Sequence, residues 1–239
     1  MTKYINKAGE VLTITQDDFS PDNPLREDDG IVGTYLTWDS RLESPMKTQY
    51  NNELDELKSL LGEEAVETAL TNNSNRPGLL SDLEEAAKKQ EIVLRPLTCY
   101  EHSGITYFIG TEDDEWDSNS LGFVYAYIKQ ARGLLGIPAD ETDKEVTKEI
   151  EDCFQAEIQL YNLYINGEVY GFNLDDKDGN DLDSCSGFYG VDLEHDLDAA
   201  EKAGLLEAVN DCSTGSGRFA KDWQPAIVER VVYRPWQEQ

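Results

Sequence analysis

The chain has 239 residues and carries 49 Asp and Glu against 20 Lys and Arg, which gives a formal net charge of -29. This charge disfavours nucleic acid and anionic membranes as direct partners and favours basic proteins. Hydrophobic residues make up 39% of the chain and aromatic residues 10%, so it is not a disordered acidic tail and can bury a core. No apolar run reaches the roughly 18 residues that a membrane span needs.

The N-terminal third is predicted to begin with strands and to continue with helices. Residues 4–14 have the pattern of a short hairpin, and 31–38 (IVGTYLTW) are β-branched and aromatic enough for a buried strand. Leucines at a spacing of three and four predict a helix over 52–61, and a second helix follows over 63–70. The composition of 71–78 (TNNSNRPG) indicates a loop.

The middle of the chain is predicted to alternate between helix and strand. Ser81 and Glu84 have the spacing of a capping box, which predicts a helix that begins there. Strands are then predicted over 92–100 and 105–110, and a third strand leads into a helix near 129–135. A proline inside the first of these strands predicts a sheet edge or a bulge.

The clearest element is a long helix over 143–165. Thr142 and Glu145 form a capping box at its start, and Asn166-Gly167 ends it. Its apolar residues recur at a spacing of three and four, which predicts one buried stripe. The stripe consists of Val146, Ile150, Phe154, Ile158, Tyr161 and Ile165.

Beyond the long helix, the sequence returns to a strand pattern. Residues 168–176 and 181–190 are predicted to form two strands joined by a turn that contains Asp178-Gly179. A short helix pair near 198–209 and a late strand over 225–233 follow.

The predicted strands are joined mostly by tight turns. This favours an α+β fold, with an antiparallel β-sheet and several packed helices, over a doubly wound fold. We expect a single domain over 1–239, and a small helical insertion at about 52–90 is an open alternative. The N-terminus lacks the apolar core of a signal peptide and the four cysteines show no CxxC spacing, so we expect reduced thiols inside a cell.

Five aspartates crowd the turn after the long helix and resemble a calcium loop. They are Asp175, Asp176, Asp178, Asp181 and Asp183. An EF-hand needs a glycine at its sixth position, and placing Gly179 there makes Leu174 the first residue and Cys185 the twelfth, where a glutamate belongs. We therefore expect a solvated hairpin turn and no metal site.

His102, Ser103, Asp117 and Ser118 supply the residue types of a hydrolytic triad. No GxSxG nucleophile elbow is present, and the second histidine, His195, lies in an acidic turn. We therefore expect no catalytic residue, no cofactor and no enzyme activity, and we assign the His102 turn and Trp116 a structural role.

Negative charge is gathered in three runs, and these are the candidate partner-binding residues. The first run is a loop without basic residues, the second is an outward stripe on the long helix, and the third surrounds the hairpin turn. A solvated face is the simpler interpretation of any one run, while several runs of one sign favour an electrostatic field built for binding. The residues are Glu112, Asp113, Asp114, Glu115 and Asp117; Glu145, Glu149 and Asp152; and Asp175, Asp176, Asp178 and Asp181.

Three blocks of the sequence resemble a family of small acidic proteins encoded by bacteriophages and mobile elements. The blocks are PLREDDGIVGTYLTWDSR (24–41), TCYEHSGITYFIGTEDDEWDSNSLGFVY (98–125) and NGEVYGFNLDDKDGNDLDSCSGFYG (166–190). The second and third match in order and spacing, and the first departs where 37–40 replace a histidine-arginine segment. The resemblance implies a phage-like origin and the cytoplasm of a bacterial host, and it raises the expectation of a host-directed inhibitor.

The charge and the resemblance together predict a non-enzymatic inhibitor that mimics DNA. Duplex DNA carries one charge per ~1.7 Å, so this net charge matches roughly 50 Å of duplex, about the diameter of a compact chain of this length. The expected partner is a basic nucleic-acid-binding host protein, such as a restriction or CRISPR component.

Two other functions remain open, as does a homo-oligomer. One is a small-molecule or nucleotide-binding protein, a sponge or an enzyme, that uses the block from Tyr100 to Ser118. A pocket lined by His102, Trp116 and Tyr189 would favour that interpretation. The other is a structural phage protein whose acidity only keeps it soluble.

Overall fold

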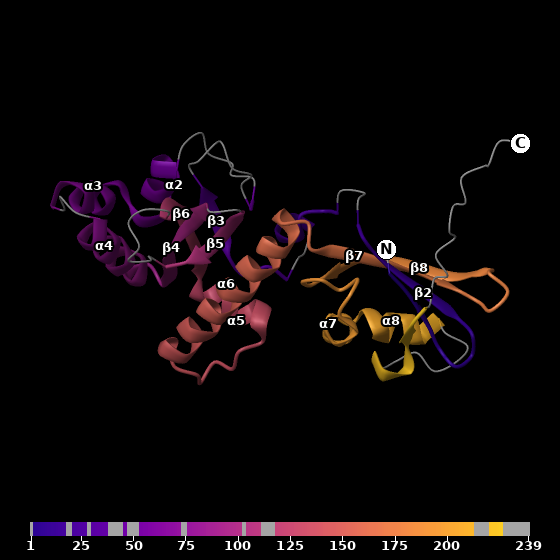
Figure 1. Cartoon of the computed structure of the whole chain (residues 1–239). Helices are drawn as coiled ribbons and strands as arrows, with labels where there is room; N and C mark the ends of the chain where they lie inside the picture. The colour runs from indigo at the N-terminus through magenta and orange to yellow at the C-terminus, as the bar shows by residue number, and fades with distance from the viewer. Residues whose placement is uncertain are drawn as a thin grey trace, which may run out of the picture. The chain divides into compact units, whose positions relative to one another are not determined.

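Antiparallel pairing dominates both sheets of the computed structural model (Figure 1). The structure describes residues 2–17, 21–27, 30–37, 45–46, 53–72, 76–101, 104–110, 118–212 and 220–226. Within them are two antiparallel sheets and eight α-helices, so the predicted α+β fold is confirmed.

The chain divides into two compact units. The central unit is Asp22–Asn166, and the terminal unit combines Met1–Pro21 with Gly167–Gln239. The prediction that the whole chain is one domain stays a prediction.

The central unit contains a four-stranded sheet with helices on both faces. The strand order is β3-β6-β4-β5, and every pair is antiparallel. The strands are β3 (Thr34–Thr37), β4 (Ile92–Glu101), β5 (Ile105–Ile109) and β6 (Ser118–Tyr127). The helices are α1 (Pro24–Glu27), α2 (Glu53–Leu61), α3 (Glu63–Asn72), α4 (Arg76–Lys89), α5 (Ile128–Leu135) and α6 (Asp143–Ile165).

The alternation of side chains along β4 shows how this sheet separates two cores. Val93 and Leu97 pack into one cluster with the buried stripe of α6, whereas Ile92 and Leu94 pack into a second cluster with α2, α3 and α4. Because neighbouring strand residues point to opposite faces, one strand supplies both cores. Helices α2 to α4 occupy 53–89, the stretch where a helical insertion was left open.

The long helix forms as predicted. The Thr142 hydroxyl accepts a hydrogen bond from the Glu145 amide, and the Glu145 carboxylate accepts one from the Thr142 amide, so the capping box is confirmed. The predicted stripe is buried at Val146, Ile150, Phe154, Ile158 and Tyr161. A sixth helix residue, Glu157, is also buried, which the apolar pattern does not predict.

Glu157 joins α6 to the segment that leads into β3. Its carboxylate accepts hydrogen bonds from the amides of Val32 (2.6 Å) and Gly33 (3.1 Å) and from the Tyr35 hydroxyl (2.8 Å). The strand predicted over 31–38 is therefore shorter than expected, because two of its amides bind this carboxylate instead of a neighbouring strand.

The terminal unit contains a five-stranded sheet in the order β8-β7-β2-β1-β9. The hairpins predicted near the N-terminus and after the long helix are both confirmed. The strands are β1 (Thr2–Ile5), β2 (Val11–Gln16), β7 (Val169–Asp175), β8 (Asp181–Tyr189) and β9 (Gln224–Pro225). The helices are α7 (Leu197–Lys202) and α8 (Leu205–Cys212), followed by the 3-10 turn η1 (Ala220–Asp222).

The core of the terminal unit lies on one face of its sheet. Leu12, Ile14, Phe172 and Leu174 pack there against α7, α8 and the buried indole of Trp223. The residues that alternate with these strand positions form the opposite face, and they are mostly polar. The predicted late strand is described only at β9, since 227–239 lie outside the described residues.

One predicted helix start is wrong. Ser81 and Glu84 do not cap α4, because this helix already begins at Arg76, inside the stretch interpreted as a loop. A proline at position 77, in the first helical turn, lacks only an amide that has no helical partner there, so it suits a helix start. Glu84 lies beside Arg95 instead, with 3.8 Å between carboxylate and guanidinium.

A bulge, one of the two alternatives predicted from the proline in β4, lies close to that proline, but its extra residue is on the neighbouring strand. The register of β4 on β6 shifts between Leu97 and Thr98, one residue after Pro96, and Leu121 of β6 is the unpaired residue. The Pro96 carbonyl accepts a hydrogen bond from the Gly110 amide, and the Gly110 carbonyl accepts one from the Thr98 hydroxyl.

Candidate interaction surfaces

The first acidic run and the suspected triad lie outside the described residues. This applies to Glu112, Asp113, Asp114, Glu115 and Asp117, and to His102, Ser103 and Trp116. Tyr189, the third residue expected at a pocket with His102 and Trp116, lies on β8 of the terminal unit. These predictions therefore stay predictions.

The second acidic run is exposed on α6 but is partly engaged within the helix. The Glu145 carboxylate closes the capping box, and hydrogen bonds from Thr142 hold its pKa below the usual value. Asp152 pairs with Lys148 at 2.6 Å. Glu149 is the member of this run for which the described structure contains no ion pair.

The third acidic run lies at the turn of the β7–β8 hairpin. Asp176 closes this turn: its carboxylate accepts hydrogen bonds of 2.8 Å from the amides of Asp178 and Asn180 and from the Asn180 side chain. These bonds, above all those from Asn180, lower the pKa of Asp176. Asp178 pairs with Lys177 at 2.7 Å, while Asp181 has no ion pair within the described residues.

A further concentration of carboxylates surrounds the start of α7. Asp196 caps this helix by accepting bonds from the amides of Asp198 and Ala199, and Asp192 lies 2.7 Å from the His195 ring. Asp192 and Asp196 also help to raise the pKa of Tyr4, after the larger effect of its burial. Together with the hairpin, this region makes the terminal unit strongly acidic.

The charge balance of the terminal unit is clearest between residues 168 and 211, a stretch that is described throughout. It contains thirteen Asp and Glu and two lysines. One of these, Lys177, is already paired with Asp178, which leaves Lys202 as the second base. Most of these carboxylates therefore face solvent without a cation of the same stretch.

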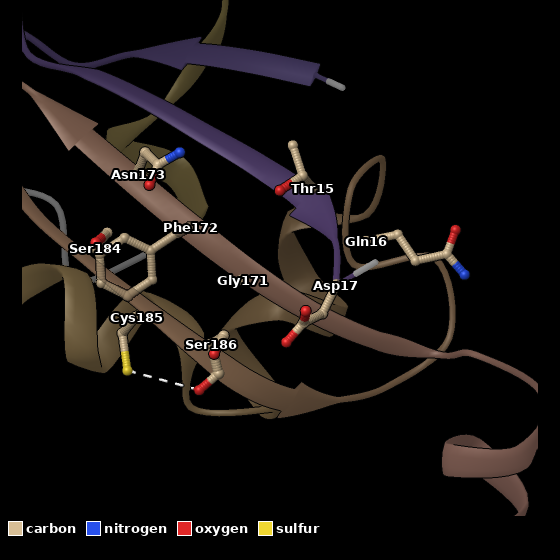
Figure 2. Close-up of a pocket in the computed structure, with 9 residues that line it drawn as sticks. All are labelled: Thr15, Gln16, Asp17, Gly171, Phe172, Asn173, Ser184, Cys185 and Ser186. Atoms are coloured by element: carbon tan, nitrogen blue, oxygen red, sulfur yellow. Dashed lines mark hydrogen bonds between the residues drawn. The ribbon is translucent and has the colours of Figure 1, made fainter. Parts of the chain in front are cut away.

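A polar groove lies on the open face of the terminal sheet (Figure 2). Thr15 of β2, Gly171 of β7 and Ser186 of β8 form one row across three strands. Gly171 forms the floor because it has no side chain, and Asp17 and Ser186 lie on either side of it. The groove has a volume of about 390 Å³ and is also lined by Gln16, Phe172, Asn173, Ser184 and Cys185.

The groove offers hydroxyl, amide and carboxylate groups, and its lining includes no histidine, lysine or arginine. Its one charged side chain, Asp17, is negative. A phosphate-bearing ligand would therefore meet like charge there. The groove suits a neutral or basic polar group better than a nucleotide.

This groove is not predicted by the sequence. Its lining comes from β2, near the N-terminus, and from the β7–β8 hairpin, which is far away in the sequence, and the register of β2 on β7 cannot be read from composition. One signal was present: Gly171, Asn173, Ser184 and Ser186 are small or polar at alternating strand positions, beside buried Phe172.

A shallower hollow of about 560 Å³ lies along α3 in the central unit. It is lined by Glu63, Glu64, Glu67, Thr68, Thr71 and Asn72. Lys58 lies 2.9 Å from Glu67 and 3.5 Å from Glu63, so part of this acidity is compensated.

Across the described ranges, no three His, Cys, Asp or Glu side chains are placed to share a metal ion. None of the helices described is both long and apolar enough to cross a bilayer. Comparison with protein-family models, curated proteins and solved structures gives no match.

Proposed function

We propose that this chain is a non-enzymatic inhibitor that binds a basic, nucleic-acid-binding protein of a bacterial host. Its carboxylates would take the place of nucleic-acid phosphates on that protein's surface. A defence protein of the restriction or CRISPR type is the kind of target that the sequence resemblance favours.

The observation that carries the proposal is the charge balance between residues 168 and 211. With thirteen carboxylates against two lysines, most acidic side chains of this stretch have no lysine of the same stretch to pair with. A stretch of one sign creates a field that speeds the approach of a basic partner and disfavours acidic ones. The terminal unit therefore supports the contact better than α6, where capping and Lys148 engage two of the three predicted residues.

The proposed contact depends on salt because both surfaces are charged. A nucleic-acid-binding protein uses Lys and Arg to neutralise phosphates, and its affinity falls as salt rises. Carboxylates that take the place of phosphates reproduce this behaviour. Exposed charges mainly set the association rate, so neutralising one of them weakens binding only modestly.

Two matched variants test the proposal. The terminal-unit variant neutralises four carboxylates that have no ion pair within the described residues: Asp181→Asn, Asp196→Asn, Asp198→Asn and Glu201→Gln. Asn at position 196 still caps α7, so the fold is retained. The central-unit variant changes as much charge elsewhere, at residues outside the three acidic runs: Glu64→Gln, Glu91→Gln, Asp140→Asn and Glu141→Gln.

Each protein is immobilised, exposed to bacterial lysate at low salt, and eluted with a salt gradient. We expect the parent chain to retain a nucleic-acid-binding protein that elutes as salt rises. The terminal-unit variant should release it at lower salt, and the central-unit variant should match the parent. A retained protein whose elution does not depend on salt, and which binds both variants as it binds the parent, would contradict the proposal.

A further inference from the structure

The outer edge of β8 has no strand beside it among the described elements. This strand is nine residues long and forms one end of the sheet order, with β7 as its single neighbour. An edge strand presents main-chain N–H and C=O groups that can pair with an added strand. The neighbouring side chains determine which kind of strand can pair with this edge.

Two serines define the groups that the edge presents. In the β7–β8 register, Ser184 is opposite Asn173 and Ser186 is opposite Gly171, with no shift between them. The Ser184 amide donates a hydrogen bond of 2.7 Å to the Asp183 carboxylate of its own strand. This bond indicates that the Ser184 amide points away from β7. Because main-chain groups alternate in direction, Ser186 presents its amide and carbonyl on the same outer side.

The same two serines border the groove. Ser184 and Ser186 line it, and Gly171 lies one strand further in. A strand added beside β8 would therefore place alternate side chains next to these serines. Neighbouring strands lie about 4.8 Å apart, so a long side chain could extend over Ser186 and Gly171 toward Asp17. Recognition by strand addition combines main-chain bonds with side-chain pockets in this way.

The charges near the edge decide the occupant. Asp181 and Asp183 lie on β8, and Asp17 lies in the groove. A second copy of this chain paired along β8 would add a strand that carries Asp181 and Asp183 and no basic residue, so the pairing would gain no opposite charge. A segment with Lys or Arg at alternating positions would meet opposite charge instead.

We propose that the β8 edge binds an extended basic segment of the partner by strand addition, with one basic side chain in the groove over Gly171. This inference rests on the proposed function and names its contact. Local features protect the edge in the free protein: Asp183 binds the Ser184 amide, and Gly187, with a φ of 89°, forms a bulge next to Ser186. The incoming strand displaces the Asp183 carboxylate from that amide.

The test is hydrogen exchange of individual amides in the full chain, measured by NMR. The probe is a ten-residue peptide of alternating lysine and valine, and the control peptide has glutamate in place of lysine. We expect saturating basic peptide to slow exchange of the Ser184 and Ser186 amides at least about tenfold, and the acidic peptide to have no effect.

A pair of variants at one position separates the main chain from the side chain. Ser186→Pro removes the outward amide on an edge strand, where proline is tolerated, and should weaken the basic peptide about three- to tenfold. Ser186→Ala keeps the amide and should therefore bind the basic peptide more tightly than Ser186→Pro. The hydrogen-exchange measurement uses the parent chain, so it tests the inference even if Ser186→Pro does not fold.

Three results would overturn the inference. Binding of the basic peptide without protection at Ser184 and Ser186 would place the contact elsewhere and leave the proposed function intact. Absence of binding, or equal protection by the acidic peptide, would remove the charge argument for this edge. Protection that rises with protein concentration in the absence of peptide would assign the edge to a second copy of the chain.

Discussion

The Tyr35 hydroxyl donates a 2.8 Å hydrogen bond to the Glu157 carboxylate, and both side chains are buried between α6 and the central sheet. The same carboxylate binds the amides of Val32 and Gly33. Burial, followed by the charge of Glu157, raises the pKa of Tyr35. Three donors on one carboxylate explain how a charged residue is retained inside the apolar stripe of α6.

We predict that Glu157→Gln destabilises the chain by about 1–3 kcal/mol, because it leaves at least one buried donor without a good acceptor. Gly33→Ala should cost a similar ~1–3 kcal/mol, since an added Cβ would lie 2.8 Å from the Glu157 carboxylate and 2.9 Å from Val124. Urea unfolding measures both. Glu149→Gln, on the exposed side of the same helix, is the control and should unfold like the parent.

Tyr35 also gives the stability of the chain a pH dependence. The pKa of Tyr35 is raised in the folded state. Its contribution to folding stability is therefore complete below the unfolded-state pKa of ~10 and is lost progressively as the pH rises above that value. Stability should therefore fall between about pH 9 and 11, and Tyr35→Phe should fall less steeply over that interval. Equal slopes for the two proteins would contradict this role of the hydroxyl.

Whether the sequence predicts a contact depends on how far apart the two residues lie along the chain. The capping box of Thr142 and Glu145 is local, and it is confirmed. Glu157 could have been noticed, because it lies three residues after Phe154 on the apolar side of the helix. Its partners at 32–35 could not, because they are far away in the sequence and meet it only after the sheet has formed.

The same reasoning applies to the candidate surfaces. The acidic runs are visible in the sequence, but which carboxylates are already engaged is not. The sequence makes Glu145 a candidate for partner binding, and in the structure it also closes a helix cap. The groove over Gly171 required the register of β2, β7 and β8, which follows from tertiary pairing.

We predict that Thr142→Ala destabilises the central unit by about 1 kcal/mol, because the cap of α6 is lost. Glu145→Ala should also lower the unfolding midpoint, because it removes the acceptor of the Thr142 amide, while affinity for a basic partner stays unchanged. Thermal unfolding and partner binding are measured on the same samples. A Glu145→Ala chain that keeps full stability but loses its partner would show that this side chain acts in binding and not in capping.

Cys212 is predicted to react slowly with alkylating reagents. Its thiol donates to the Asp183 carboxylate at 2.8 Å, and this bond raises the pKa of Cys212 to about 11. At pH 8 the exposed Cys185 should be alkylated at least about tenfold faster, as peptide mapping would measure. Asp183→Asn should accelerate alkylation of Cys212, because it removes the negative charge that favours the protonated thiol, whereas Asp181→Asn should not.

The hairpin turn is predicted to need no metal, because Asp176 already directs both carboxylate oxygens to Asp178 and Asn180. The pKa of Asp176 is lowered in the folded chain, so its contribution to folding stability is present at neutral pH and is lost as the pH falls below about 4. Asp176→Ala should lower the unfolding midpoint of the terminal unit. Calcium or a chelator should shift the melting temperature of the parent by no more than a few degrees, and a larger shift would contradict the turn interpretation.

The central claim, that acidic side chains of the terminal unit replace nucleic acid on a basic partner, is tested most directly by competition. The partner retained from lysate is purified and titrated with duplex DNA and with this chain at several salt concentrations. We predict mutually exclusive binding, an affinity that falls linearly on a logarithmic salt scale, and a shallower slope for the variant with Asp181, Asp196, Asp198 and Glu201 neutralised. A ternary complex with DNA, or an affinity that is independent of salt, would contradict the claim.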